Sequence, residues 1–178
     1  MNDFGVGTIA GSDSIQKFER MLHYLIMRCG ERENVGQKVL CYLCYFSDFD
    51  HYERSFRSIT GKKYIKNPHG PIPFGFEGSL DVLERNGMIE KERKQCDGFR
   101  HCFFRSLNDP DMGRFLPAEI ESMESAIERY GFMTDAEIEE IIGKDVPWLV
   151  TKDGDPIDYG AAMYRDPFTS VDYLKTDR

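Results

Sequence analysis

The sequence predicts an α+β fold: a mainly helical single domain with a small antiparallel β-hairpin in a wing-like position. Three observations lead to this prediction. Apolar residues recur at spacings of three and four over most of the chain, which is the period of an α-helix. One pair of strand-like segments flanks an Asp97-Gly98 turn. The length of 178 residues, with 40% hydrophobic and 30% charged residues, suits one globular domain.

Two helices are expected in the first third of the chain. An apolar stripe over residues 15–29 follows serine and aspartate N-cap candidates and ends at Gly30. A second helix is expected to start near Asn34, which together with Gln37 resembles a capping box. Residues 39–46 of this helix are all apolar or aromatic, so we expect the helix to be buried on every side and to form the centre of the core.

Residues that begin and end helices set the positions of the later elements. Asn86-Gly87 ends a third helix, Pro117 opens a fourth, and Thr134 with Glu137 forms a capping box for a short fifth helix. The expected elements are a helix marked by residues 76–83, strands at 88–94 and 100–107 joined by a turn at 95–99, helices at 117–130 and after 134, and a last helix at 157–164.

The most informative segment runs from Ile59 to Pro73. Gly61 and Gly70 permit positive φ or a close backbone approach, and prolines at positions 68, 71 and 73 fix their own φ angles. Tyr64 and the isoleucine after it favour a short strand. We expect a turn, a short extended segment and a rigid double corner, which either presents a surface or locks two elements together.

The charge of the chain is unevenly distributed. Residues 109–178 carry 17 Asp and Glu against 7 Lys and Arg, a net charge of −10, which leaves +2 for residues 1–108. An acidic C-terminal third repels nucleic acid and favours basic partners. Residues 51–69 carry five basic residues against one acidic residue, which suits phosphate, an acidic protein surface or simply a solvated face.

The sequence lacks the patterns that catalysis or metal binding usually needs. It has no nucleophile elbow, phosphate loop or dinucleotide fingerprint. Cys41 and Cys44 lie in the most hydrophobic helix, where cysteine acts as a small apolar side chain, and Cys96 and Cys102 flank a turn without a second close pair. We therefore expect no enzyme, no cofactor and no metal.

A winged helix is the alternative suggested by the order of a helix, a tight stop and a hairpin. The presumed recognition helix carries Glu77, Asp81 and Glu84 against Arg85 alone, which is the wrong balance for a helix that faces phosphates. The topology is wing-like, and a nucleic-acid-binding regulator remains the alternative function.

No membrane partner is expected. The longest apolar runs fall short of the roughly 20 residues that cross a bilayer, and the N-terminus lacks the pattern of a signal peptide. Five cysteines, an odd number, argue against a secreted disulfide framework. These observations predict a cytoplasmic protein.

Three motifs together resemble a known family. They are Tyr45-Phe46-Ser47-Asp48, Ile59-Thr60-Gly61-x-x-Tyr64 and His69-Gly70-Pro71-Ile72-Pro73, with Pro147-Trp148 later in the chain. The set resembles the Panacea domain of SocA-like antitoxins and phage-associated proteins, over roughly Ile15 to Tyr164. One departure is Gly143, because many members carry a histidine at that position.

The resemblance implies a prokaryotic antitoxin that neutralises a cognate toxin protein by direct binding. One group of the family acts as an adaptor that hands its toxin to a protease, so a protease is a second implied partner. We expect the domain over residues 12–165, with short mobile termini at 1–11 and 166–178. The residues that carry the resemblance, and that we take as candidates for partner binding, are Asp48, Thr60, Gly61, Tyr64, His69, Gly70, Pro71 and Trp148.

Two of these residues have a stated expected role. Asp48 is expected to organise the turn at Thr60 from the end of the buried helix, the alternative being a solvated carboxylate. Trp148, the only tryptophan, is expected to plug the core. Six aromatic residues around the loop are candidate binding anchors, of which we expect the core to take at least half: Phe49, Tyr52, Phe56, Tyr64, Phe74 and Phe76.

Overall fold

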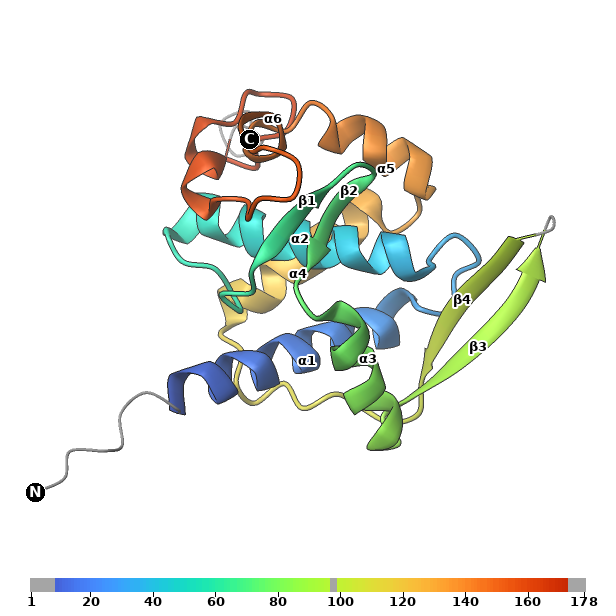
Figure 1. The fold of residues 1–178 in the computed structure, drawn as a ribbon. Helices are drawn as coiled ribbons and strands as arrows, with labels where there is room; N and C mark the ends of the chain where they lie inside the picture. The colour runs from blue at the N-terminus through green and yellow to red at the C-terminus, as the bar shows by residue number, and fades with distance from the viewer. Residues whose placement is uncertain (1–8, 97–98, 173–178) are drawn as a thin grey trace, which may run out of the picture.

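The computed structural model describes residues 9–96 and 99–172, with side chains from residue 16 onward except those of 94–101. It is a mainly helical domain built around helix α2 (Gln37–Ser55), as Figure 1 shows. The predicted class, α+β with helices dominating, is confirmed. Every residue from Val39 to Asp50 is buried, so the prediction of a helix buried on all sides is also confirmed.

Helix α1 (Ile9–Cys29) begins earlier than predicted and ends where predicted. Serine and aspartate are only moderately unfavourable inside a helix, so the caps expected before residue 15 do not limit it. At Gly30 the backbone comes so close to the next layer that a Cβ would lie 2.4 Å from the carbonyl oxygen of Phe104. Packing against Phe104 therefore requires a glycine at this position.

The capping box predicted at Asn34 is wrong. Helix α2 begins at Gln37 with Gly36 as N-cap, which offers no side-chain hydrogen bond. The Asn34 amide instead donates to the carbonyl oxygens of Gly131 at 3.2 Å and Met133 at 2.8 Å. A tertiary contact to a distant turn has taken the side chain that the sequence pattern assigned to a local cap.

The other predicted elements up to residue 142 are present with small shifts of their ends. The turn predicted at 95–99 includes residues 97–98, which lie outside the described residues. The elements are α3 (Phe76–Arg85), β3 (Ile89–Cys96), β4 (Phe99–Ser106), α4 (Pro117–Tyr130) and α5 (Asp135–Ile142), followed by α6 (Val146–Val150) and the 3₁₀ helix η1 (Tyr159–Tyr164). Helix α6 was not predicted, and η1 replaces the expected α-helix from residue 157, where Gly160 weakens the first turn.

A second hairpin stands where the sequence predicted one strand and a double corner. Strands β1 (Tyr64–Asn67) and β2 (Gly70–Pro73) pair antiparallel, with Ile65 opposite Ile72. The outer edge of β1 is covered by the chain after α6: Lys66 N donates to Asp155 O at 3.0 Å and Ile157 N to Tyr64 O at 2.8 Å. The prolines of β2 hid its strand character, because proline is rare within sheets.

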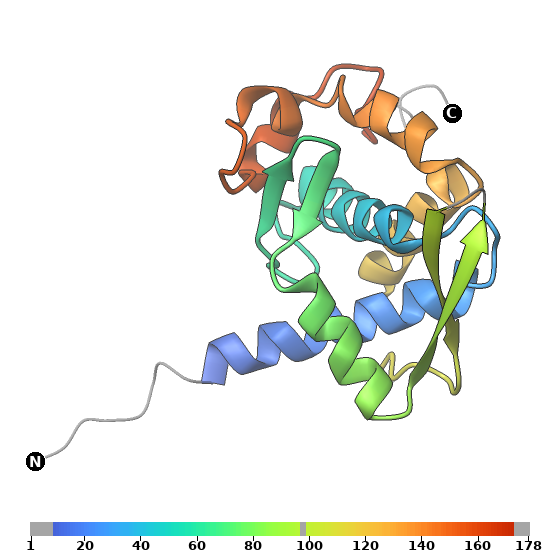
Figure 2. The same cartoon turned by 45° about the vertical axis from the view of Figure 1, so that its right-hand side comes forward.

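The remaining elements surround α2 on several sides (Figure 2). On one side Phe46 stacks on Tyr130 of α4, with ring centroids 4.0 Å apart. On another side Phe49 stacks on Tyr159 of η1 at 4.4 Å. Aromatic rings placed around one buried helix thus join segments that are about 100 residues apart in the chain.

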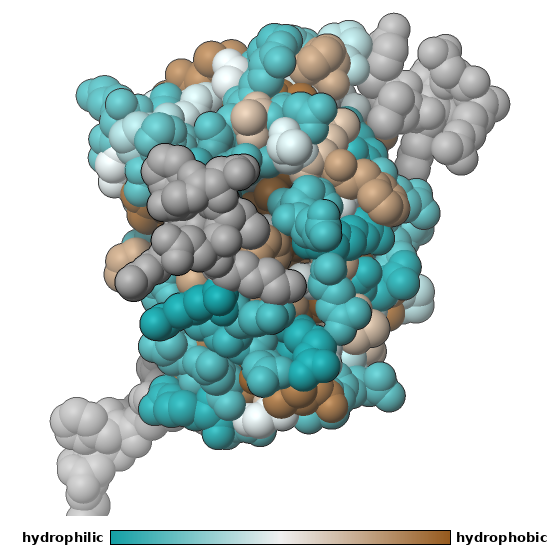
Figure 3. All heavy atoms as spheres, turned by 90° about the vertical axis from the view of Figure 1, so that its right-hand side faces the viewer, coloured by the Kyte–Doolittle hydropathy of each residue, from teal (hydrophilic) through white to brown (hydrophobic). Residues whose placement is uncertain are grey.

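The β3–β4 hairpin projects from one side of the domain next to α3, in the wing-like position that was predicted (Figure 1). The molecular face on that side is mostly hydrophilic, with separate hydrophobic patches (Figure 3). Within the described residues no helix has the length and hydrophobicity needed to cross a membrane.

Candidate partner-binding site

The carboxylate of Asp48 organises the turn at Thr60. Asp48 is fully buried and accepts hydrogen bonds from Thr60 N at 2.8 Å and from Thr60 Oγ1 at 2.5 Å. The Tyr64 hydroxyl lies 2.7 Å from Asp48 Oδ2 and 2.9 Å from Cys44 O. The expected contact is present, and the alternative of a solvated carboxylate is wrong. Burial raises the pKa of Asp48, and the hydrogen bonds from Thr60 and Tyr64 lower it in part.

Trp148 reaches the same hairpin from the opposite end of the sequence. The Lys66 ammonium lies 4.6 Å from the centroid of the Trp148 ring and donates to the carbonyl oxygens of Trp148 at 3.0 Å and Thr151 at 2.9 Å. Trp148 itself is only partly buried against the core. It therefore supports β1 through Lys66, which is a more peripheral position than that of the expected core plug.

At the far end of the hairpin, Gly70 rests directly on helix α2. Its φ is +150°, and a Cβ there would lie 2.4 Å from Cε1 of Tyr42. The Tyr42 hydroxyl lies 2.8 Å from both His69 O and Glu139 Oε1. The approach seats Pro71 and Pro73 in buried positions and leaves His69 exposed. Gly61, at the other end, also has a positive φ of +68°.

A groove lies between α2, the β1–β2 hairpin and the start of α3. Its volume is about 610 Å³, and its lining is mainly apolar. Phe74 and Ile72 are the exposed apolar side chains at the groove, with 66% and 38% of their surface accessible. The other main lining side chains are Tyr42, Ile65, Pro73 and Phe76.

Five of the eight candidate residues fall into two groups. Asp48, Thr60 and Tyr64 are buried supports of the hairpin, whereas His69 and Gly70 line the groove. Of the six aromatic anchors, the core takes Phe49, Tyr64 and Phe76, while Phe56 and Phe74 are exposed and Tyr52 stacks on Tyr159. The expectation that the core takes at least half of them is confirmed.

Sequence reasoning missed two contributors to the groove. Tyr42 was assigned to the core by its apolar surroundings, although its hydroxyl holds the tip of the hairpin. Ile72 was read only as part of a motif, although its alternation with buried Pro71 and Pro73 could have shown that it faces outward.

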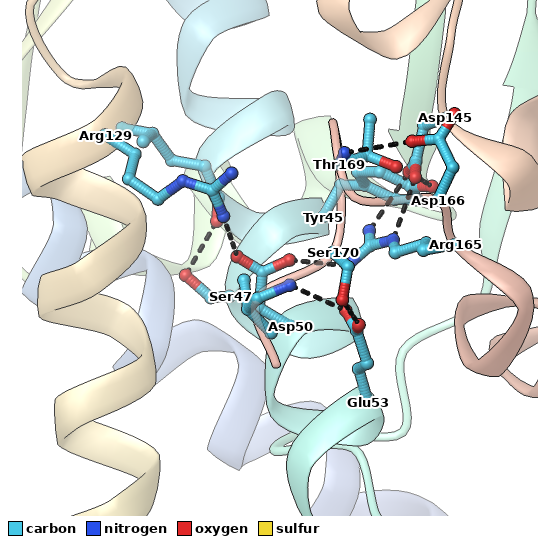
Figure 4. A network of polar contacts seen from close by, with 12 residues as sticks. Tyr45, Ser47, Asp50, Glu53, Arg129, Asp145, Arg165, Asp166, Thr169 and Ser170 are labelled. Atoms are coloured by element: carbon cyan, nitrogen blue, oxygen red, sulfur yellow. Dashed lines mark hydrogen bonds and ion pairs between the residues drawn. The ribbon is translucent and has the colours of Figure 1, made fainter. Parts of the chain in front are cut away.

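A buried ionic cluster ties the C-terminal segment to α2 (Figure 4). The guanidinium of Arg165 donates to Asp145 Oδ1 at 2.8 Å and to Asp50 Oδ1 at 2.7 Å, with its side chain fully buried. It also contacts Glu53 at 3.1 Å. Sequence reasoning missed this cluster because no local pattern links residues 115 positions apart.

Residues 169–171 continue this contact and are all buried. The amide of Val171 donates to Glu53 Oε2 at 3.2 Å, and the Ser170 hydroxyl donates to Glu53 Oε1. This part of the segment after residue 165 therefore packs on α2. Residues 1–8 and 173–178, for which mobile termini were expected, lie outside the described residues.

Two histidine–serine pairs resemble catalytic dyads only in distance. Nδ1 of His51 lies 3.0 Å from Oγ of Ser122, and Nε2 of His23 lies 2.9 Å from Oγ of Ser106. Ser122 is 1% exposed, and its hydroxyl donates to the carbonyl oxygen of Ala118, which uses its proton. A substrate cannot reach Ser122, so the His51–Ser122 pair is structural. The Ser106 hydroxyl likewise donates to the carbonyl oxygen of Asn108 at 2.7 Å, which uses its proton.

Cys41 and Cys44 are placed as apolar side chains. Cys41 and Cys44 are 4% and 0% exposed, and burial raises the pKa of both thiols. In the part of the chain that the structure describes, no cluster of three or more His, Cys, Asp and Glu could hold a metal ion.

The fold and the site thus define a mainly helical domain whose rigid hairpin borders an exposed apolar groove. A family model described as antitoxin SocA-like, Panacea domain, matches residues 40–149, and the chain therefore belongs to this family. The resemblance seen in the motifs is confirmed, over a shorter stretch than residues 15–164. No curated protein and no solved structure matches the chain.

Proposed function

We propose that this protein is an antitoxin that neutralises a cognate protein toxin by binding it directly at the groove beside the β1–β2 hairpin. Family membership supports the antitoxin function. The observation that carries the choice of surface is the exposure of Phe74 and Ile72 at the groove, next to the motif residues His69 and Gly70. Aromatic and aliphatic side chains at a hollow are the usual centres of binding energy in protein interfaces.

The hairpin is suited to binding because it is rigid before any partner arrives. Asp48 fixes the turn at one end, Tyr42 holds the other end, and prolines restrict β2. A surface that is already ordered loses little conformational entropy when it binds. This rigidity supports a role for the motif residues as the frame of the site.

The free edge of β2 favours side-chain contacts over the addition of a strand. Phe74 N donates to Lys63 O at 2.8 Å, so these two residues form a hydrogen-bonded pair. In an antiparallel ladder, hydrogen-bonded pairs alternate with non-hydrogen-bonded pairs, whose N–H groups point away from the partner strand. Pro71 and Pro73 lie in non-hydrogen-bonded pairs, so their N–H groups would point outward from the hairpin. Proline has no N–H, so a toxin strand would find no donors on this edge.

The test is a growth assay of the adjacent open reading frame, induced with and without this protein. We expect a product that is toxic alone, harmless with this chain, and co-purified with it. Phe74→Ala and Ile72→Asp should weaken the complex by at least about tenfold, as expected for central interface residues. Phe132→Ala, at a 75% exposed phenylalanine outside the groove, is the matched control and should rescue growth fully.

Each part of the proposal can fail separately. A harmless neighbour, or one that does not bind at micromolar concentration, would contradict the antitoxin function. Rescue that survives both groove variants would contradict the choice of surface alone. The adaptor form of the function adds one expectation, that the toxin is degraded faster in cells when this chain and the protease are both present.

A nucleic-acid-binding regulator is the second candidate, favoured by the wing-like position of β3–β4. Its charges weigh against it, because two of the described basic side chains pair with acids: Arg105 with Glu90, and Lys91 with Glu77 at 4.0 Å. Paired cations release fewer counterions on binding phosphates. A gel shift on the upstream DNA of its own gene tests this function, and no shift at low salt would remove it.

A further inference from the structure

A second hollow lies on the other side of the hairpin, between α6, residues 151–158 and η1, in the orange to red part of Figure 1. Its volume is about 700 Å³. Val150 and Tyr164 line it with 67% and 77% of their surface exposed, and Leu149 beside it is 57% exposed. Several neighbouring apolar side chains that are mostly exposed on a small domain commonly mark an interaction site.

The charge around this hollow is mainly negative. Asp155 and Asp158 line it and are exposed, against the single cation Lys152. Asp153, in the same turn, is 3.6 Å from Lys66, whose ammonium also binds two carbonyl oxygens. In the described part of the chain, the Asp155 carboxylate has neither a hydrogen-bond nor an ion-pair partner. The carboxylates and the exposed Tyr164 ring are the two groups that attract a cationic side chain.

We propose that this hollow is a second interaction surface, which binds a protein segment that carries an arginine or lysine beside an apolar side chain. The apolar side chain fits between Val150 and Tyr164, and the cation pairs with Asp155 and Asp158 and lies against the Tyr164 ring. The site is separate from the groove at Phe74, and it does not depend on the proposed toxin binding.

The probe is a displayed library of random peptides selected on the full-length protein. Selected peptides should carry arginine or lysine next to leucine, phenylalanine or a similar residue. A synthetic peptide of this kind should bind at least tenfold more weakly to Tyr164→Ala and to the double variant Asp155→Asn, Asp158→Asn. Its affinity should also fall as salt is raised, because exposed charges are screened.

Asparagine at position 158 keeps the oxygen that caps Gly160 N at 2.9 Å, so the double variant should fold normally, which its thermal melting checks. Phe74→Ala and Asp81→Asn are matched controls and should leave peptide affinity unchanged. The proposal is overturned if selection enriches no basic apolar peptide, or if the peptides bind the acidic variants as well as the wild type. It is also overturned if Phe74→Ala abolishes their binding, or if the free protein self-associates through Tyr164.

Discussion

At the residue scale, Asp48 and Gly70 show how single side chains fix the hairpin. Asp48 supplies a buried hydrogen-bond acceptor for three polar groups, and Gly70 has no Cβ at the point where the backbone meets Tyr42. Both residues belong to the family motif. Their environment gives them a structural role, and each role leads to a quantitative expectation.

Replacing Gly70 by alanine should destabilise the protein by about 2 kcal/mol or more. The added Cβ would lie 2.4 Å from Tyr42, and a φ of +150° is unfavourable for any residue with a side chain. Gly78→Ala is the matched control, because Gly78 lies inside α3 with open space around it. It should stabilise by about 0.5–1 kcal/mol. Urea denaturation of both variants gives the answer, and equal effects would contradict the packing argument.

Replacing Asp48 tests how much its buried carboxyl group stabilises the protein as a hydrogen-bond acceptor. Asp48→Ala leaves Thr60 and Tyr64 without their acceptor and should cost about 2–4 kcal/mol, whereas Asp48→Asn keeps one acceptor and should cost less. Denaturation of both variants at pH 7 measures the two costs. An alanine variant as stable as the asparagine variant would contradict this role.

The pH dependence of the stability difference between the wild type and Asp48→Asn tests the pKa of Asp48. Because burial raises the folded-state pKa above 3.8, the folded protein binds more protons than the unfolded chain between 3.8 and that pKa. The stability contribution of Asp48 is thus complete below pH 3.8 and declines as pH rises through the folded-state pKa. The stability of the wild type relative to Asp48→Asn should increase from pH 7 to pH 4. A flat difference would contradict the raised pKa.

At the element scale, local signals are reliable where the neighbouring structure leaves them free to act. The capping box of α5 is present: Thr134 Oγ1 accepts from Glu137 N at 3.3 Å, and Glu137 Oε2 accepts from Thr134 N at 2.8 Å. Both residues are exposed, so no tertiary contact competes for them. Asn34, in contrast, had carbonyl oxygens of another segment within reach.

Thr134→Ala should destabilise the protein by about 1 kcal/mol, since it removes the side-chain acceptor of the cap. Thr134→Ser keeps that oxygen and should stay close to the wild type. Thermal denaturation compares the two variants directly. If serine loses as much as alanine, the hydroxyl oxygen is not the source of the stability.

The hairpins show what element-scale patterns miss. Strands β3 and β4 have eight residues each and were predicted as strand-like segments on either side of the Asp97-Gly98 turn. Strands β1 and β2 have four residues each, and two prolines lie in β2. They are stable because α2 lies on one side and residues 154–157 pair with the outer edge of β1. Short strands depend on such neighbours, which a local pattern cannot show.

At the scale of the whole molecule, Arg165 joins the C-terminal segment to the central helix. Asp50, Glu53 and Asp145 surround it, and the Arg129 guanidinium also lies 3.6 Å from Asp50. Removing one partner from a buried ionic cluster costs more than the cluster contributes in total, because the other charges stay buried.

Arg165→Met should therefore destabilise the protein by about 3–5 kcal/mol at pH 7. Arg57→Met, at an exposed arginine, is the control and should change stability by less than about 0.5 kcal/mol. Burial raises the pKa of Asp50 and the Arg165 charge lowers it in part, so without Arg165 the Asp50 carboxyl should take up a proton more readily. The loss for Arg165→Met should therefore shrink between pH 7 and pH 5. Melting temperatures at the two pH values measure this, and a loss that does not depend on pH would contradict the ionic origin.

The sequence by itself determined the helical class, most helix ends, the β3–β4 hairpin and the family, because periodicity, caps and motif spacing are properties of neighbouring residues. Only the tertiary structure decided that Asp48 is a buried support of the hairpin and that Phe74 is exposed at the groove. It also decided that β1 and β2 form a hairpin and that Arg165 holds three carboxylates. Each of these depends on which distant segments meet around α2. Burial and charge pairing arise from that meeting, and no local pattern contains it.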